Sequence, residues 1–385
     1  MLLALSGPRL GAAQDRAAPH IEDPSGHALD ALHRALRRAE QDEGTARLLF
    51  YGASHTSSDQ YTGYLRRLLQ PRFGDAGHGF VLPARPFTFY NQRDARIRSS
   101  GPWRTLRVRG RDRRPGIYGL LGAAVETRGR ARASIEPRRR RGRGSEVAFF
   151  EVFYLEQREG GSMEILIDDV VTERIRTEGQ GLGYARYDVP LGAHRLELRT
   201  QGDGPVRLFG IVMETGQPGV IVEPLGIPGS RAEDQLPWDA DAQAEHLRRR
   251  APDLLVLAYG TNESGYRRFA PDAYEEKLRQ VVQRARRAAP QASCLLIGPS
   301  EWPERVNGTW VPRESTAAII AVQRRVAQDH GCGFFDLVRF IGGPGSMEAW
   351  VNADPPLALD DHVHYTEHGH RRLAEALAQA LLTGY

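Results

Sequence analysis

The sequence predicts a three-layer α/β fold interrupted by an inserted β-sandwich, and three observations support this fold class. Apolar runs of strand length alternate with amphipathic helical patterns in residues 27–82 and again in residues 216–385. Between these segments, residues 83–215 show a period of two with glycine turns and no amphipathic helix. The chain has 385 residues, of which 41% are hydrophobic, and can therefore bury two cores. We expect one α/β domain, built from the two outer segments, into which the middle segment is inserted.

The two outer segments supply five strands and their helices in alternation. Each predicted strand is a short apolar run, and each predicted helix repeats apolar residues at helical spacing. Because parallel strands need a long crossover, usually a helix, this alternation indicates a parallel sheet with helices on both faces. The predicted strands are 47–51, 220–225, 254–259, 294–298 and 333–337, and the predicted helices are one that ends at Gly44, then 61–69, 241–250, 272–288, 315–330 and 367–383.

The middle segment has the pattern of strands rather than helices. Met163, Ile165 and Ile167 recur at every second position, with Glu164 and Asp168 among the residues between and after them, as in a strand with one face buried. Residues 147–155 are apolar on both faces, as expected for a central strand. Repeated short strands separated by turn signals predict a β-sandwich for residues 83–215.

Charge and hydropathy exclude two classes of partner. Lys277 is the only lysine among the 52 basic residues, and this bias towards arginine runs through the whole chain without a nucleic-acid motif, so we expect no nucleic acid. No stretch has the apolar length needed to span a bilayer, so the chain is not expected to be transmembrane. The densest basic run, residues 138–143, lies between a proline and a glycine. We expect an exposed loop there, either merely solvated or in contact with an anionic polymer.

The N-terminal segment bears on the cellular compartment. Residues 1–26 are expected to be irregular, and their apolar start, followed by Gly11-Ala12-Ala13, resembles the end of a secretory signal that lacks its basic start. We therefore expect export to the periplasm or cell envelope. Cys294 and Cys332 each open a predicted buried strand, and a disulfide is conceivable if these strands are neighbours, but the pair by itself indicates no compartment.

A serine, an aspartate and a histidine form the strongest catalytic pattern in the chain. Ser54 follows the first predicted strand, and Asp361 and His364 lie near the start of the last predicted helix. A serine hydroxyl needs an imidazole to take its proton, and the imidazole needs a carboxylate to fix its tautomer. A spacing of three residues places the aspartate and histidine on one face of a helical turn, so one short loop could deliver both. The chain order serine, aspartate, histidine is one that such triads take.

Two further strand ends carry candidate donors for an oxyanion. Asn262 follows the strand 254–259, and its amide can donate to a developing negative charge. The strand 220–225 runs into a glycine-containing turn at Gly229, where a backbone N–H is the second candidate. Because ligands of parallel sheets bind beyond the carboxyl ends of the strands, we expect Ser54, Gly229 and Asn262 to meet.

Each of these residues also has a simpler explanation. Ser54 could be a helix N-cap, and Gly229 and Asn262 could belong to turns that precede helices. A metal site is a further alternative, because four histidines fall within nine residues and two of them have i, i+4 spacing; they are His362, His364, His368 and His370. The convergence on strand ends favours the serine pattern, which implies neither a metal nor a cofactor.

The four blocks resemble those of the SGNH or GDSL-type hydrolases. They are Gly52-Ala53-Ser54, residues 226–229, Gly260-Thr261-Asn262 and residues 361–364. The resemblance implies a flavodoxin-like fold with a five-stranded parallel sheet, and a Ser54 nucleophile completed by His364 and Asp361. It also implies an oxyanion hole made by the N–H groups of Ser54 and Gly229 and the side chain of Asn262. One departure is Ala53, which replaces the usual aspartate of the first block.

Within this family, residues 73–80 and 342–347 with Trp350 resemble the bacterial carbohydrate O-acetylesterases that act on peptidoglycan. In those enzymes an inserted sandwich looks like a carbohydrate-binding module. We therefore expect a serine esterase that removes a small acyl group, acetyl, from a bacterial carbohydrate polymer. Two alternatives remain: a lipase or thioesterase for longer acyl esters, and an inactive glycan-binding protein, which the change at Ala53 motivates.

The insert is expected to bind polymer and to carry no chemistry. Its candidate sugar contacts are the arginine loop 138–143 and the aromatic side chains of Trp103, Tyr118 and Tyr154. Aromatic faces can stack on sugar rings, but an aromatic residue in a sandwich is more often part of the core.

Overall fold

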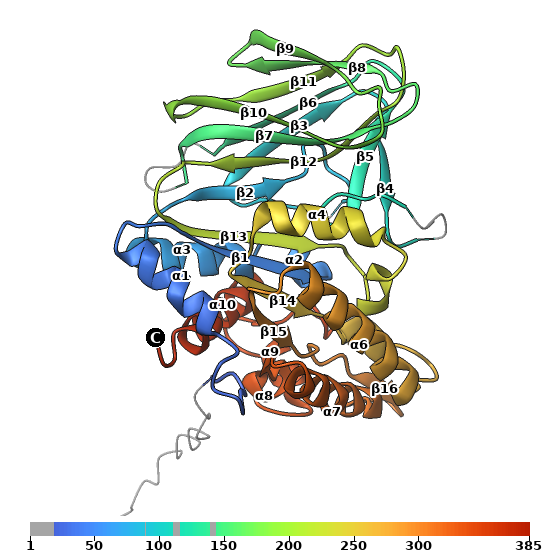
Figure 1. Cartoon of the computed structure of the whole chain (residues 1–385). Helices are drawn as coiled ribbons and strands as arrows, with labels where there is room; N and C mark the ends of the chain where they lie inside the picture. The colour runs from blue at the N-terminus through green and yellow to red at the C-terminus, as the bar shows by residue number, and fades with distance from the viewer. Residues whose placement is uncertain (1–18, 89, 111–115, 139–143) are drawn as a thin grey trace, which may run out of the picture.

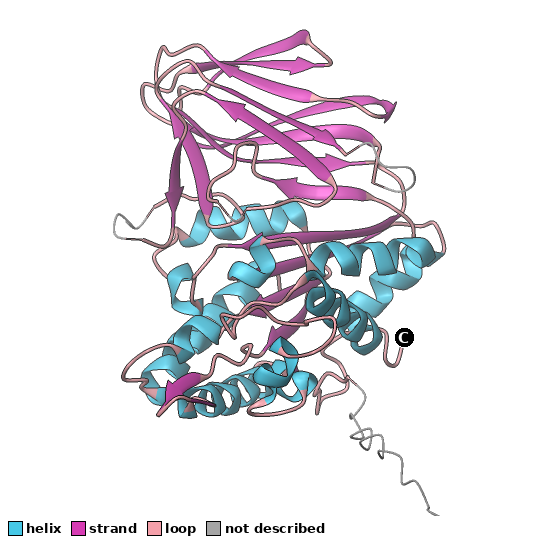
Figure 2. Cartoon of the chain, turned by 180° about the vertical axis from the view of Figure 1, so that it is seen from behind, coloured by secondary structure: helices cyan, strands magenta, loops and turns pink. Residues whose placement is uncertain are grey.

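The computed structural model describes residues 19–88, 90–110, 116–138 and 144–385. An α/β part and a β-sandwich are stacked on each other, with the sandwich at the top of Figure 1. The view from behind shows the same division, with helices confined to the lower part (Figure 2). The predicted fold class is confirmed.

The α/β part contains a five-stranded parallel sheet. Its spatial order is β13 (Gly219–Gly226), β1 (Thr45–Gly52), β14 (Leu254–Ala258), β15 (Ser293–Ile297) and β18 (Gly333–Phe335). Counted along the chain, these are strands 2-1-3-4-5, which is the flavodoxin-like order. Every neighbouring pair is parallel, and Gly52 of β1 lies opposite Gly226 of β13 and Ala258 of β14. Three strand ends are therefore level with one another beside the nucleophile block.

Helices cover both faces of this sheet, and alternate residues of β1 face the two sides. Leu48 and Phe50 join a core with α1 (Asp30–Glu40), α3 (Tyr61–Phe73) and α10 (Glu367–Leu381). Leu49 and Tyr51 join the opposite core with α4 (Ala240–Arg250), α6 (Pro271–Ala288) and α7 (Glu314–Asp329). The strands are apolar on both faces because each face is covered.

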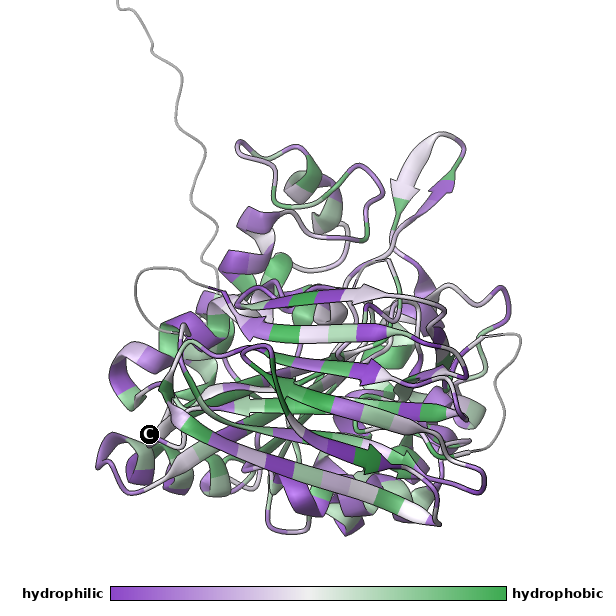
Figure 3. Ribbon diagram, turned by 90° about the horizontal axis from the view of Figure 1, so that it is seen from above, coloured by the Kyte–Doolittle hydropathy of each residue, from purple (hydrophilic) through white to green (hydrophobic). Residues whose placement is uncertain are grey.

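Two antiparallel sheets form the sandwich, as the period of two predicts. One has the order β10 (Gly181–Gly192), β7 (Val147–Glu156), β12 (Val206–Glu214), β5 (Ala123–Thr127) and β4 (Arg104–Arg107), with β2 (Gly77–Val81) also paired to β12. The other has the order β3 (Ala95–Ser100), β6 (Arg132–Pro137), β11 (Leu196–Thr200), β8 (Ser162–Ile167) and β9 (Val170–Arg176). Apolar and polar segments alternate along these strands (Figure 3). The strand β2 precedes residue 83, so the sandwich strands begin earlier than the expected start of the insert.

The sandwich shares a continuous core with the α/β part, and buried charges lie at the junction. Arg250, at the end of α4, donates to Glu214 of β12 and to Glu223 of β13. Glu223 also accepts the backbone N–H of Phe80 at 2.7 Å. Gly79 has a φ of +73°, and a Cβ there would lie 2.3 Å from the Glu223 carboxylate. The sandwich and the α/β part are therefore joined by buried ion pairs and by the close packing of Gly79 against Glu223.

The short elements lie mostly at the carboxyl edge of the parallel sheet, and the sequence patterns did not reveal them. They are α2 (Ser54–Ser57), η1 (Ala232–Gln235), α5 (Thr261–Ser264), the hairpin of β16 (Glu304–Val306) and β17 (Thr309–Val311), α8 (Leu337–Ile341) and α9 (Ser346–Val351). The predicted strand 333–337 is two residues too long, because Asp336 caps α8 by accepting the N–H of Arg339 at 2.9 Å. None of the helices in the described part of the chain is long and apolar enough to cross a membrane.

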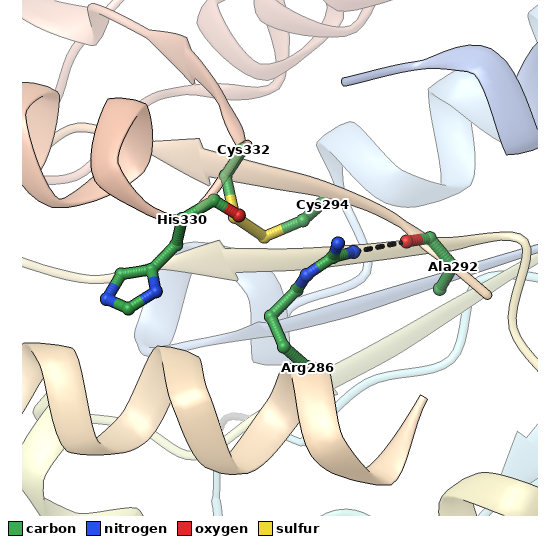
Figure 4. The surroundings of a disulfide bond; sticks show 5 residues. All are labelled: Arg286, Ala292, Cys294, His330 and Cys332. Atoms are coloured by element: carbon green, nitrogen blue, oxygen red, sulfur yellow. Dashed lines mark hydrogen bonds between the residues drawn. A yellow bond between two sulfur atoms is a disulfide. The ribbon is translucent and has the colours of Figure 1, made fainter. Parts of the chain in front are cut away.

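Cys294 and Cys332 form a disulfide across neighbouring strands (Figure 4). Cys294 lies in β15 and Cys332 immediately before β18, and the next pair of residues, Leu295 and Gly333, are opposite each other in the sheet. The Cα atoms of the two cysteines are 4.6 Å apart. The strands are neighbours, so the conceivable bridge is present. The predicted signal remnant lies largely outside the described residues, whereas Glu22 forms a β-bridge with Phe334.

Candidate active site

The junction of β1 and α2 presents Ser54. The strand ends at Gly52 and the helix begins at Ser54, so the chain turns within one residue. A Cβ on Gly52 would lie 2.3 Å from Oγ1 of Thr56 and 3.1 Å from the Ala258 carbonyl, so glycine alone fits there. Because Ser54 opens a helix, its N–H has no partner within the helix and remains available.

Backbone groups support this turn, where the resemblance described above leads us to expect an aspartate in place of Ala53. The Gly52 carbonyl accepts the N–H of Ile227 and the hydroxyl of Ser230, both at 3.0 Å. The Ala53 carbonyl accepts the N–H of Ser57 at 3.0 Å. The turn is therefore tied to the end of β13 without a side chain from position 53.

Hydrogen bonds join the three predicted triad residues. Ser54 Oγ lies 2.9 Å from Nε2 of His364, and Nδ1 of His364 lies 2.6 Å from Oδ2 of Asp361. The other carboxylate oxygen of Asp361 accepts the N–H groups of Val363 and His364, each at 2.9 Å. Although partial burial acts in the opposite direction, the hydrogen bonds from His364 and Val363 lower the pKa of Asp361. The carboxylate is thus ionised and fixed where it can orient the imidazole.

The segment that holds Asp361 and His364 is a tight turn rather than the expected helical turn. His362 has a positive φ of 57°, and the N–H of Leu359 donates to the His364 carbonyl at 2.7 Å. Residues Ala358 and Tyr365 close the turn by a β-bridge. The spacing of three residues works here because the turn folds the aspartate back onto the histidine.

The two predicted oxyanion donors beyond Ser54 lie on the adjacent strand ends. Gly229 follows β13 in the left-handed region, with a φ of +72°. One N–H of the Asn262 amide donates to the Ser230 carbonyl at 2.9 Å, which fixes the side chain and leaves its second N–H available. Asn262 also lines a cavity together with Ala53 and His55. The structure therefore brings together the ends of β1, β13 and β14 that carry the predicted donors.

A buried carboxyl group, Glu263, connects the turns that carry these donors. It accepts the N–H of Gly260 at 3.0 Å and the N–H of Ala232 at 2.9 Å. Its side chain is buried, and this burial raises the pKa of Glu263 to about 7. Sequence reasoning missed this residue, because an acidic residue next to Asn262 has no distinguishing pattern.

His55 is a second residue near the site that the sequence did not reveal. Its Nε2 donates to the Val363 carbonyl at 3.1 Å, and its ring centroid lies 5.3 Å from that of His364. Desolvation, followed by the positive charge that His364 can carry, lowers the pKa of His55 to about 4. His55 is therefore neutral near pH 7 and does not repel a protonated His364.

The other three histidines of the predicted cluster do not converge on one point, although the ring of His370 lies 5.6 Å from that of His55. His362 stacks on Trp310 at 4.1 Å between ring centroids, His370 is buried beside Tyr365, and His368 is exposed. Among the described residues, no three His, Cys, Asp or Glu side chains gather in a way that could hold a metal ion.

The insert, which is expected to carry no chemistry, contacts turns at the edge of the site. Asn91 donates from its backbone and side chain to the carbonyls of Ser57 and Ser58, both at 3.2 Å. Arg109 donates to the Pro228 carbonyl at 3.2 Å, next to Gly229. The sandwich lies close to these turns because it packs against α4 and against β13, the edge strand of the parallel sheet.

The aromatic residues expected to contact sugar are packed into or against the core of the insert. Tyr118 and Tyr154 are each 7% exposed and belong to the core, so their faces are not available to a sugar. Trp103 packs against the same core and donates from its indole to the Arg132 carbonyl at 3.0 Å. Of the arginine loop 138–143, Arg138 donates from Nε to the Ala95 carbonyl at 3.1 Å, and residues 139–143 lie outside the described residues.

The sheet order, and the placement of Ser54, Asn262 and His364 at the carboxyl edge of the sheet, are those expected of an SGNH-type hydrolase. Residues 185–372 match the model of the GDSL-like Lipase/Acylhydrolase family.

Two known proteins are similar to this chain. A solved structure of a peptidoglycan O-acetylesterase has a TM-score of 0.79 and 26% sequence identity, over 94% of this chain and 97% of that one. The GDSL lipase Rv0518 of Mycobacterium tuberculosis is 32% identical over 153 residues, which make up 38% of this chain and 60% of that protein. The match thus spans less than two thirds of this relative.

Proposed function

We propose that this chain is a serine esterase whose nucleophile is Ser54. The observation that carries the proposal is the unbroken hydrogen-bonded chain from Ser54 through His364 to Asp361. Ser54 Oγ attacks the ester carbonyl carbon while Nε2 of His364 takes its proton. The alcohol then leaves with that proton, and the acyl group stays on Ser54. Water, deprotonated by His364, attacks the acyl-enzyme and releases the acid together with the free serine.

In the proposed reaction, a negative charge develops on the substrate oxygen and a positive charge on His364, and each is stabilised by neighbouring groups. The N–H groups of Ser54 and Gly229 and the side chain of Asn262 donate to the oxyanion of the tetrahedral intermediate. Asp361 stabilises the imidazolium that His364 becomes. Because His55 is neutral, the imidazolium does not face a second positive ring 5.3 Å away.

We infer that the substrate is an acetyl ester on a bacterial carbohydrate polymer, such as peptidoglycan. The similarity to a peptidoglycan O-acetylesterase, which includes the sandwich because it covers 94% of this chain, supports this substrate. Trp310 also lies beside the proposed triad, half-buried and stacked on His362, where an aromatic ring suits a sugar. The sandwich would then bind the polymer outside the acyl site.

Acetate release from O-acetylated peptidoglycan and from O-acetylated xylan tests this proposal. We expect faster release from peptidoglycan by the wild type, and none by a folded Ser54→Ala variant. Because the chain is also similar to a GDSL lipase, a series of aryl esters of increasing chain length belongs to the same experiment. A rate that rises with chain length would favour a lipase or thioesterase, and polymer binding without any ester cleavage would favour an inactive glycan-binding protein.

We also propose that the protein acts in the periplasm or cell envelope. The disulfide between Cys294 and Cys332 supports this location, since such bonds persist in oxidising compartments. Alkylation of thiols in freshly broken cells provides a test. We expect the mature protein to resist alkylation before reduction and to fractionate with the periplasm, whereas two reactive thiols on a cytosolic protein would contradict the location.

A further inference from the structure

Arg109, a residue of the insert, lies directly on the turn that carries Gly229. It follows β4, and its Nη1 donates to the Pro228 carbonyl at 3.2 Å. A Cβ on Gly229 would lie 2.4 Å from the same nitrogen, so the guanidinium covers this glycine closely. On its other side, Nε of Arg109 lies 3.8 Å from the carboxylate of Asp234. The sandwich thus places the guanidinium of Arg109 against the peptide between Pro228 and Gly229 in the α/β part.

That peptide contains the proposed oxyanion donor. The carbonyl of Pro228 and the N–H of Gly229 belong to the same planar group, so a bond to the oxygen also fixes the direction of the N–H. A hydrogen bond at the carbonyl polarises the peptide and makes its N–H a stronger donor. The positive charge of Arg109 further favours the negative charge that develops on the substrate oxygen.

The contacts of Arg109 distinguish it from the other arginines nearby. Arg231 lies over the ring of Tyr266, with its guanidinium carbon 3.9 Å from the ring centroid. Arg104, at the start of β4, pairs with Glu126 and has 69% of its side chain exposed. By contrast, Arg109 combines a bond to the Pro228 carbonyl with close cover of Gly229.

We propose that Arg109 is a positioning residue of the oxyanion hole, which holds and polarises the peptide between Pro228 and Gly229. The proposal rests on the esterase function inferred above. It makes the inserted sandwich part of the machinery that turns over any ester, including one too small to contact a polymer-binding surface.

Steady-state kinetics with a small aryl acetate test the proposal, with Arg109→Gln and Arg109→Lys as variants. Removal of a direct oxyanion donor lowers kcat by about 100- to 1,000-fold, so loss of its positioning partner should lower kcat by less, about 10- to 100-fold for the glutamine variant. We expect the Michaelis constant to change less than about twofold, because a positioning partner acts in the transition state. Lysine keeps a charged donor without the guanidinium geometry and should recover part of kcat. The matched control is Arg104→Gln, in which kcat should equal that of the wild type.

The outcomes separate this inference from the proposed function. A raised Michaelis constant with unchanged kcat would make Arg109 a substrate-binding residue and overturn the positioning role, as would wild-type kinetics in folded Arg109→Gln. If the glutamine variant does not fold, the lysine variant decides, because a change confined to the Michaelis constant again overturns the proposal. An inactive wild type, or a fully active Ser54→Ala variant, contradicts the esterase function itself.

Discussion

Single residues at the site have their ionisation set by local contacts. Hydrogen bonds keep Asp361 ionised against partial burial, and desolvation keeps His55 neutral at 5.3 Å from His364. The proposed proton transfer from Ser54 to His364 therefore creates a positive charge next to a fixed carboxylate and away from any second positive ring. Such groups need little rearrangement when charge develops.

Asn262→Ala should lower kcat by about 100- to 1,000-fold, the usual effect of deleting one oxyanion donor, with substrate affinity nearly unchanged. The physical reason is that the free N–H of this amide meets negative charge in the transition state only. Steady-state kinetics on an aryl acetate measure the effect. The control is Asn352→Ala, which removes an exposed asparagine at the end of α9. A change in the Michaelis constant alone would show that Asn262 binds substrate instead.

Some site residues can be predicted from a local sequence pattern, whereas others are recognised only by their contacts in the folded chain. Ser54, Asn262 and His364 follow strand ends or belong to short blocks, so a local pattern identifies them. Glu263 and Arg109 have their roles through burial and through contacts with turns from other parts of the chain. No spacing in the sequence encodes such contacts, so these residues emerge from the structure alone.

At the scale of elements, long amphipathic helices and buried strands were predictable and short elements were not. The helices α4, α6 and α7 begin within one residue of their predicted starts, because each repeats its apolar pattern over several turns. The predicted strand 333–337 extends into the first residue of α8, since Leu337 is apolar and buried. The hairpin of β16 and β17 turns at Asn307-Gly308, a pair typical of hairpins, but its strands are too short to show a period of two.

The end of α4 provides a test of how the two parts of the chain are joined. Arg250 has 4% of its side chain exposed and pairs with Glu214 and Glu223. Arg250→Met leaves the buried carboxylate of Glu223 without a cationic partner, whereas Glu214 keeps its ion pair with Arg47 at 2.9 Å. Breaking a buried pair in this way costs about 3–5 kcal/mol of unfolding free energy. Arg371→Met, a control in which the arginine side chain is 65% exposed and its partner Glu375 is 51% exposed, should cost about 1 kcal/mol or less. Equal losses in denaturant unfolding would contradict a buried network at the junction.

At the scale of the whole molecule, the sandwich and the α/β part share one core, and His246 lies within it. This histidine of α4 stacks on Phe153 of β7 and meets Phe209 of β12 edge-on, at centroid distances of 5.5 and 5.2 Å. Desolvation, and then the charge of Arg249, lowers the pKa of His246 to about 3. The junction between the two parts therefore contains a ring that must stay neutral.

This histidine makes the stability of the whole chain sensitive to acid. The unfolded chain binds a proton at this histidine below about pH 6.5, whereas the folded chain does so only near pH 3, so stability falls as the pH drops through this window. The slope for one such group is at most about 1.4 kcal/mol per pH unit. We expect His246→Phe to lose less stability on acidification than the wild type, as measured by denaturant unfolding from pH 7 to pH 4. Parallel curves for the two proteins would contradict burial of His246, and His368→Phe, at an exposed position, is the control.

The central claim is that Ser54 is a nucleophile activated by His364, and covalent labelling tests it most directly. A serine-directed fluorophosphonate, followed by peptide mass spectrometry, should place one adduct per chain on the peptide that contains Ser54. The adduct should be absent from Ser54→Ala and should form far more slowly in His364→Ala, because the imidazole no longer takes the serine proton. An adduct on a different residue of the wild type, or equal labelling of a folded Ser54→Ala variant, would contradict the account.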